Sequence, residues 1–225
     1  MSDKSSKTRT LISVGVICAL AFVCTVFFHF RASFLTFDLK DAVMAVGAMI
    51  FGPAYGAASV IIVSLAEMLL ISTTGLYGFI MNVLSSITFV LVGSIIYRTR
   101  RTLAGALFAM VSAVIATTAV MLGANLVITP FYMGVSASDV AKMIPTLLLP
   151  FNLIKTIFNS ALLFVIYKPI ANALRSAKII GGGKTAIESA KLTKRSVIIT
   201  LSAVLIAAAA LVVFFIYLEG SFSFA

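Results

Sequence analysis

Charged residues are scarce in this 225-residue sequence: they make up 11% of the chain, against 61% hydrophobic residues. A soluble domain normally carries about twice that share of charge. The shortage excludes an ordinary soluble fold. We expect an all-α polytopic membrane protein that forms one helical bundle, because several apolar runs approach the roughly 20 residues needed to cross a bilayer.

Groups that build active sites and metal centres are also few. His29 is the only histidine, and Cys18 and Cys24 lie in the first apolar run without metal-ligand spacing. The sequence has no HExxH motif and no serine with a nearby histidine that could form a relay, so we expect no enzyme, cofactor or metal site. The GGGKT run at 181–185 lacks the first glycine of a phosphate-binding loop, whose position holds Lys178. We interpret it as a flexible basic linker, so energy from ATP would come from another subunit.

Seven apolar runs follow one another along the chain. Residues 42–51 are short for a span, and Gly52-Pro53 breaks the chain after them. We count this run as a short second helix starting near Asp38, because otherwise the arginine cluster at 98–101 would emerge opposite the basic N-terminus. The expected spans are residues 10–28, 42–51, 54–72, 76–97, 103–127, 147–168 and 196–218.

The basic residues predict the orientation in the cell membrane. With the N-terminus in the cytoplasm, thirteen of the 17 Lys and Arg residues lie inside, Arg31, Lys40 and Lys142 lie outside, and Lys155 is buried. This asymmetry follows the positive-inside rule. The expected parts are a six-helix domain over 1–175, a basic cytoplasmic linker over 176–195 and an additional C-terminal transmembrane helix over 196–225.

Two outer segments connect the spans. Residues 29–41 interleave charged and apolar side chains, so this connecting loop could fold over a cavity mouth or be an ordinary solvated connector. Pro130 with Gly134 is expected to mark a turn after the fifth span, and residues 136–143 are expected to form an outer loop.

The sixth span carries a polar stripe inside its apolar run. At 100° per residue, Asn152 and Asn159 fall within about 20° of each other on a helix, and Lys155 lies about 60° away. A lysine inside a bilayer helix costs roughly 2.5 to 3.5 kcal/mol, so it normally faces a bundle interior, a cavity or a partner. A ligand site and a structural stripe, with a snorkelling lysine and asparagines that join helices, both remain open.

The predicted orientation places several polar side chains at one depth. Glu67, Asn82, Asn125, Asn152 and Lys155 all fall in the outer half of the bundle, on four different spans. A small-molecule site needs a few placed polar groups in an apolar pocket, and asparagine suits a neutral heterocycle or polyol. The alternative is that Glu67 and Lys155 neutralise each other as a structural ion pair.

At this point the sequence resembles a known family. The similar segments are FLTFDLKDAVMAVGAMIFGPAYG at 34–56, TTGLYGFIMNVLSS at 73–86, IYRTRRT at 96–102 and LLPFNLIKTIFNSALLFVIYK at 148–168. They resemble the substrate-binding S-component of energy-coupling factor (ECF) vitamin transporters, riboflavin type. The similarity covers roughly residues 11–169, and the Pro-Phe-Asn-Leu-Ile-Lys run is its most specific part.

The resemblance implies a six-helix bundle that captures a vitamin from outside. Such a bundle docks on a membrane coupling protein with two cytoplasmic ATPase subunits. By similarity, Gly15 and Ala19, a small-residue pair in the first span, would pack on the coupling protein. The substrate-binding positions implied by the resemblance are Asn125, Asn152 and Lys155, together with Phe37, Asp38, Leu39 and Asp41 in the loop that covers the vitamin.

Two departures from the family pattern leave alternatives open. Riboflavin-type relatives usually carry a Lys-Asn pair where this chain has Ala66-Glu67, so the acid could select another vitamin or precursor. The seventh run lies outside the resemblance, and we expect deletion of residues 184–225 to leave substrate binding within a few-fold. A membrane scaffold without a ligand is the third hypothesis, and it predicts that no small molecule stabilises the protein.

Overall fold

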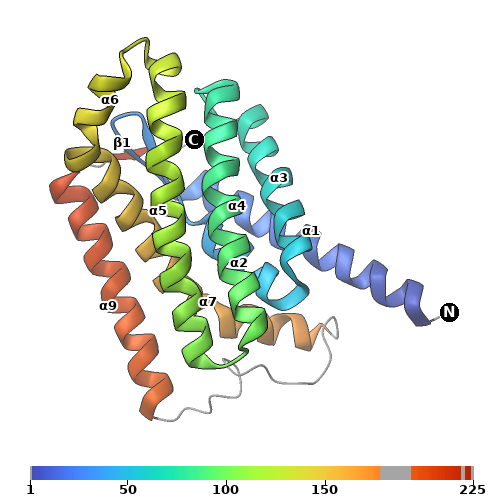
Figure 1. Cartoon of the computed structure of the whole chain (residues 1–225). Coiled ribbons are helices and arrows are strands. Elements are labelled where there is room, and N and C mark those ends of the chain that lie inside the picture. The colour runs from blue at the N-terminus through green and yellow to red at the C-terminus, as the bar shows by residue number, and fades with distance from the viewer. Residues whose placement is uncertain (1, 178–193, 219–220, 224–225) are drawn as a thin grey trace.

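The computed structural model describes residues 2–177, 194–218 and 221–223, and Figure 1 shows them as a bundle of helices with a small sheet at one end. The longer helices are α1 (Ser2–Phe27), α3 (Pro53–Leu70), α4 (Gly75–Thr99), α5 (Leu103–Met133), α7 (Leu149–Ser176) and α9 (Lys194–Tyr217). The shorter elements are α2 (Lys40–Phe51), α6 (Ala137–Met143), the π-helical turn η1 (Ile144–Leu148) and the strands β1 (His29–Ala32), β2 (Leu35–Phe37) and β3 (Ser221–Ser223).

Five segments among the described residues are long and apolar enough to cross a membrane. They are α1 from Thr8, α3, α4, α5 and the continuous helical stretch Ala137–Ser176. α2 has 12 residues, and the apolar part of α9 is the shorter stretch Leu201–Tyr217. Length and composition therefore support five of the seven expected membrane spans.

The short helix α2 lies at the centre of the bundle. All residues from Lys40 to Met49 are buried, and α2 packs against α1, α3, α4 and α7. Small side chains allow this close packing: a Cβ added at Gly47 would lie 2.9 Å from Ile17 Cδ1 on α1. Its apolar composition on all sides therefore fits its place in the core, since a buried helix needs no polar face.

Glycine and proline set several helix ends. The predicted break at Gly52-Pro53 is confirmed: Gly52 has a φ of 116°, and Pro53 opens α3. The turn predicted from Pro130 with Gly134 is confirmed at Gly134 only, because α5 continues through Pro130 to Met133. Gly134 ends the helix in the left-handed conformation, with its N–H donating to the Pro130 carbonyl.

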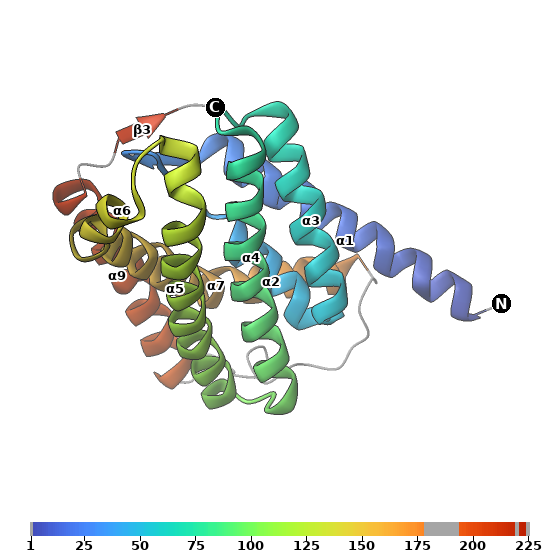
Figure 2. The ribbon, with the colours of Figure 1, turned by 45° about the horizontal axis from the view of Figure 1, so that its top comes forward.

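The segment expected as a connecting loop, residues 29–41, forms a hairpin. β1 and β2 pair antiparallel through Phe30 with Phe37 and Ala32 with Leu35, and the tight turn includes Ser33 at a φ of 56°. β3, from the C-terminal end, pairs with the other edge of β1, as Figure 2 shows. We call β1 and β2 the cap hairpin. The expected outer loop at 136–143 is likewise mostly the helix α6.

The C-terminal helix α9 is part of the packed structure. It lies along α7, on the opposite side of the bundle from α1 (Figures 1 and 2). Phe214 on α9 is completely buried in an apolar cluster with Phe30, Phe37 and Phe151. This packing argues against the expectation that deletion of residues 184–225 leaves substrate binding within a few-fold. The predicted linker 176–195 falls mainly on residues 178–193, which lie outside the described residues.

Close packing at Gly56 provides a test of the bundle. A Cβ at Gly56 on α3 would lie 2.4 Å from Ala48 Cβ and 2.8 Å from Val90 Cγ1. We therefore expect Gly56→Ala to separate α3 from α2 and α4 and to destabilise the protein by about 1 to 3 kcal/mol. Thermal unfolding in detergent measures this loss as a lower midpoint.

Gly123→Ala on α5 is the matched control, because a Cβ there meets no atom within 4 Å. This variant should unfold at or above the wild-type temperature, since alanine favours the helix by up to about 1 kcal/mol. Equal midpoints for the two variants would contradict the close helix packing described for α2, α3 and α4.

Candidate ligand-binding site

A cavity of about 230 Å³ lies between the cap hairpin and the ends of α3, α4, α5 and α7. The hairpin contributes one wall through its turn and β2. The helices contribute the polar groups, and aromatic and methionine side chains supply flat apolar surface between them. The lining includes Arg31, Ser33, Phe34, Leu35, Thr36, Tyr77, Met81, Met121, Thr129, Tyr132 and Phe151.

The polar residues predicted to converge do meet at this cavity. Glu67, Asn82, Asn125, Asn152 and Lys155 all belong to its lining, although they come from four helices. All except Asn82, which is partly exposed, are buried. The structure therefore has an apolar pocket with a few placed polar groups, the usual composition of a small-molecule site.

The other predicted contact residues lie behind the cavity wall. Phe37, Asp38, Leu39 and Asp41 are buried, and none of them belongs to the cavity lining. The chain turns into the bundle after β2, so the part of the hairpin that faces the cavity is Arg31 and residues 33–36. The hairpin wall of the cavity thus comes from Arg31 and residues 33–36, and residues 37–41 are buried behind that wall.

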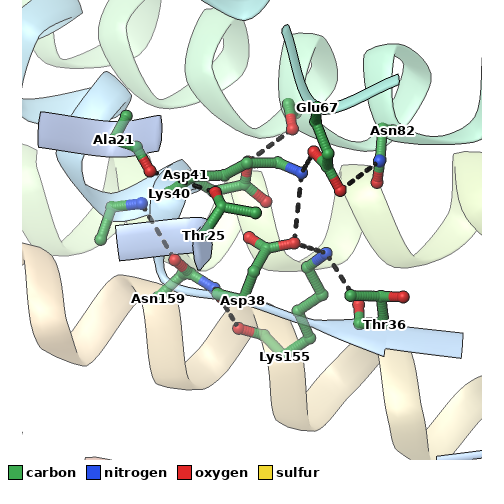
Figure 3. A network of polar contacts seen from close by, with 12 residues as sticks. Ala21, Thr25, Thr36, Asp38, Lys40, Asp41, Glu67, Asn82, Lys155 and Asn159 are labelled. Atoms are coloured by element: carbon green, nitrogen blue, oxygen red, sulfur yellow. Dashed lines mark hydrogen bonds and ion pairs between the residues drawn. The ribbon is translucent and has the colours of Figure 1, made fainter. Parts of the chain in front are cut away.

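A network of buried charges connects this support to the cavity (Figure 3). Lys40 Nζ lies 3.3 Å from Asp38 Oδ2 and also donates to Glu67 Oε2. Lys155 Nζ donates to the same Asp38 oxygen at 3.0 Å and to the Thr36 carbonyl at 3.2 Å. Asn82 Nδ2 donates to the other Glu67 oxygen, Oε1, at 2.9 Å. The network joins the cap hairpin to α2, α3, α4 and α7.

Asp38 holds the two lysines together. Its Oδ2 atom lies 3.3 Å from Lys40 Nζ and 3.0 Å from Lys155 Nζ, so one carboxylate oxygen is shared by both ammonium groups. Asp41 lies close by and accepts a 2.5 Å hydrogen bond from the Ser86 hydroxyl, which ties the start of α2 to α4.

The hypothesis of a Glu67–Lys155 ion pair is wrong. Glu67 pairs with Lys40, and Lys155 pairs with Asp38. The sequence predicts Lys40 in the connecting loop on the outer side of the membrane, whereas its side chain is completely buried at the start of α2. The sequence does carry a signal for this burial, namely the three charges of Asp38-x-Lys40-Asp41 directly before an apolar run. Charges so close to a buried helix need partners of opposite charge.

Asn159 has a structural role in this arrangement. Its Oδ1 accepts from the Ala42 N–H at 2.9 Å, and its Nδ2 donates to the Asp38 carbonyl at 3.0 Å. These bonds satisfy backbone groups at the first turn of α2, which lacks a side-chain cap of its own. The polar stripe of α7 therefore has two roles: Asn152 and Lys155 line the cavity, and Asn159 binds the backbone at the start of α2.

The small residues of α1 lie away from the cavity. Gly15 and Ala19 are both exposed on the outside of the bundle, and a Cβ at Gly15 would meet no atom within 4 Å. Apolar side chains at Ile12, Val16 and Val23 are exposed on the same helix. This face is open to lipid or to a partner helix.

The five apolar helical segments and the polar-lined cavity are the features expected of a membrane protein with a small-molecule site. Residues 9–167 match the family model described as "ECF transporter, substrate-specific component", so the chain belongs to this family, and the resemblance seen in the sequence is confirmed. This is a family of transporter substrate-binding components, not an enzyme family. The chain is thus an S-component of an ECF transporter, a multi-pass membrane protein that works with an ECF module.

Two relatives are similar over most of their length. The chain is 29% identical to the riboflavin transporter RibU of Staphylococcus aureus (strain TCH60) over 181 residues, which cover 75% of this chain and 94% of that protein. It is also similar to a solved structure described as "Structure and mechanism of the S component of a bacterial ECF transporter". That comparison has a TM-score of 0.65 and 26% identity, and it covers 75% of this chain and 99% of the other.

The charge network predicts a strong effect of removing Lys40. Lys40→Met would leave Asp38 with one cation and Glu67 with only Asn82, and both carboxylates are buried. Breaking a buried ion pair in this way typically costs about 3 to 5 kcal/mol. We expect a large drop in the unfolding temperature in detergent, partly restored by adding Glu67→Gln.

Lys142→Met is the matched control, because Lys142 pairs with Asp139 on the surface at 3.0 Å with both side chains exposed. An exposed pair contributes little, so this variant should unfold like wild type. A Lys40→Met variant as stable as Lys142→Met would show that the buried network does not hold the bundle together.

Proposed function

We propose that this chain captures riboflavin or a related flavin from outside the cell for ATP-driven uptake. The observation that carries the proposal is the meeting of Glu67, Asn82, Asn125, Asn152 and Lys155 in one cavity of an ECF S-component. The similarity to a riboflavin transporter over most of the length of that protein supports the choice of ligand.

The chemistry of the cavity suits a flat heterocycle with a polar chain. Asn152 Nδ2 donates to the Leu148 carbonyl at 2.7 Å, and its Oδ1 accepts no hydrogen bond from any residue the structure describes. Asn82 Oδ1 likewise accepts no hydrogen bond within the described part of the chain, whereas its Nδ2 donates to Glu67 Oε1. These oxygens can accept from ligand N–H or O–H groups, while Phe34, Phe151 and their neighbours offer surface for a ring.

A second candidate is another vitamin or precursor. Glu67 favours it, because a buried carboxylate in the cavity lining accepts hydrogen bonds and prefers a ligand edge rich in donors. Glu67 is held by Lys40 and Asn82, so its negative charge is already compensated. A neutral donor edge therefore fits better than a cation.

The proposal extends to topology and partners. α1, α2, α3, α4, α5 and α7 would form the six spans, with α9 as an additional one and the N-terminus in the cytoplasm of a cell-membrane protein. Gly15 and Ala19 would form the contact with a membrane coupling protein that carries two ATPase subunits. Their exposure on α1, opposite α9, supports this role.

Asn152 tests the ligand-binding role of the cavity. Asn152→Ala should leave polar atoms of bound riboflavin without a partner, which costs about 1 to 3 kcal/mol, or roughly one to two decades in affinity. Titration of the purified protein in detergent, followed by quenching of flavin fluorescence, measures the change. Asn172→Ala, at an exposed asparagine on the same helix, is the control and should bind like wild type.

Other outcomes separate the alternatives. If the wild-type protein does not bind riboflavin but is stabilised by another vitamin, the assignment as a transporter component stands and the proposed flavin ligand is wrong. If no member of a vitamin panel stabilises the protein, the scaffold hypothesis is favoured. Equal affinities of Asn152→Ala and Asn172→Ala would remove Asn152 from the site.

The exposed face of α1 gives a separate test of the partner contact. Gly15→Leu or Ala19→Leu should block co-purification with the coupling protein and ATPases, because a bulky side chain keeps the helices apart. Riboflavin affinity of the isolated variant should stay at the wild-type value, since this face is remote from the cavity lining. Gly123→Leu, at an exposed position on α5, is the control for assembly. Intact assembly of both α1 variants would contradict the assignment.

A further inference from the structure

The C-terminal elements lie outside the part of the chain that its relatives share. The family model ends at residue 167, and 75% of this chain accounts for 99% of the solved S-component. α9 and β3, which begin at Lys194 and Ser221, are therefore additions to the common domain. Both additions nevertheless contact the cap hairpin.

Phe214 is the first contact. Its ring is completely buried, and its centroid lies 4.8 Å from that of Phe37, 6.2 Å from Phe30 and 6.4 Å from Phe151. Phe30 and Phe37 are opposite each other on β1 and β2, and Phe151 lines the cavity. One side chain of α9 thus backs the cap hairpin and the cavity wall together.

Strand β3 is the second contact. It pairs antiparallel with β1, with Phe30 opposite Phe222 and Arg31 opposite Ser221. The sheet order β2-β1-β3 leaves β1 in the middle, so its free edge is covered (Figure 2). A two-stranded hairpin alone is marginally stable, and a third strand with an apolar backing is what makes such a unit hold its shape.

We propose that α9 and β3 form a clamp that keeps the cap hairpin closed over the cavity, with Phe214 as a positioning residue for ligand binding. The proposal rests on the proposed function of the cavity. Arg31 and residues 33–36 of the hairpin form one wall of that cavity, so a hairpin held in place prolongs the contacts of a ligand bound against it. The clamp therefore sets the lifetime of the bound ligand more than its rate of entry.

The first experiment measures riboflavin kinetics by stopped-flow fluorescence, well below the unfolding temperature of each full-length variant. For Phe214→Ala we expect the dissociation rate to rise about tenfold while the association rate changes less than about twofold. Phe214→Leu, which keeps apolar volume, should restore much of the wild-type lifetime. Tyr217→Ala removes an aromatic ring from the same helix at a position 60% exposed, and it should release riboflavin at the wild-type rate.

The second experiment needs no ligand and tests β3 by amide hydrogen exchange of residues 29–37. Consecutive residues of a strand direct their N–H groups to opposite sides, so only one of Ser221→Pro and Phe222→Pro removes a hydrogen bond to β1. We expect exchange in the cap hairpin to accelerate in that variant and to stay unchanged in the other. Each proline variant is thus the control for its partner.

The two experiments separate the clamp from the proposed function. If the wild-type protein does not bind riboflavin, the proposed flavin ligand is wrong. The hydrogen-exchange rates of the cap hairpin then test the clamp by themselves, because they need no ligand. Wild-type dissociation rates in Phe214→Ala would overturn the positioning role, and so would a lower unfolding temperature without faster release. Hairpin exchange that is the same in both proline variants and in wild type would overturn the role of β3.

Discussion

The structure depends on the need to neutralise two lysines inside an apolar bundle. Lys40 and Lys155 are both buried, and each lies within ion-pair distance of the same Asp38 oxygen. An unpaired ammonium at this depth would cost more than most single interactions contribute, so the elements that carry the partners must come together. This requirement joins the cap hairpin, the central helix α2, α3 and α7 around one point.

The same charges that hold the bundle together also shape the cavity. Glu67 and Lys155 line the cavity and pair with Lys40 and Asp38, which lie behind the cavity wall. Asn82 is held in the same way by its bond to Glu67. Their side chains are therefore ordered before any ligand arrives, which lowers the entropy cost of binding. A site of this kind can recognise a neutral ligand through hydrogen bonds without burying further charge.

The additional C-terminal helix and the proposed partner-binding face lie on different sides of the bundle. α9 packs along α7, whereas the exposed small residues Gly15 and Ala19 lie on α1 at the opposite side of the bundle. The clamp and the proposed partner face thus do not compete. A change in one can be made without altering the other, because the core formed by α2 lies between them.

The sequence by itself determined the class of protein and the helix boundary at Gly52-Pro53, and it predicted the five polar residues that meet at the cavity, because hydropathy and helical periodicity are local properties. It also carried the family resemblance in the run around Asn152 and Lys155. Only the tertiary structure decided which charges pair: Lys40 with Glu67, and Lys155 with Asp38. It alone also showed that residues 29–37 form strands and that Phe214 backs them. Strand pairing and burial of a ring from the far end of the chain depend on contacts between distant segments, and such contacts leave no periodic pattern in a single sequence.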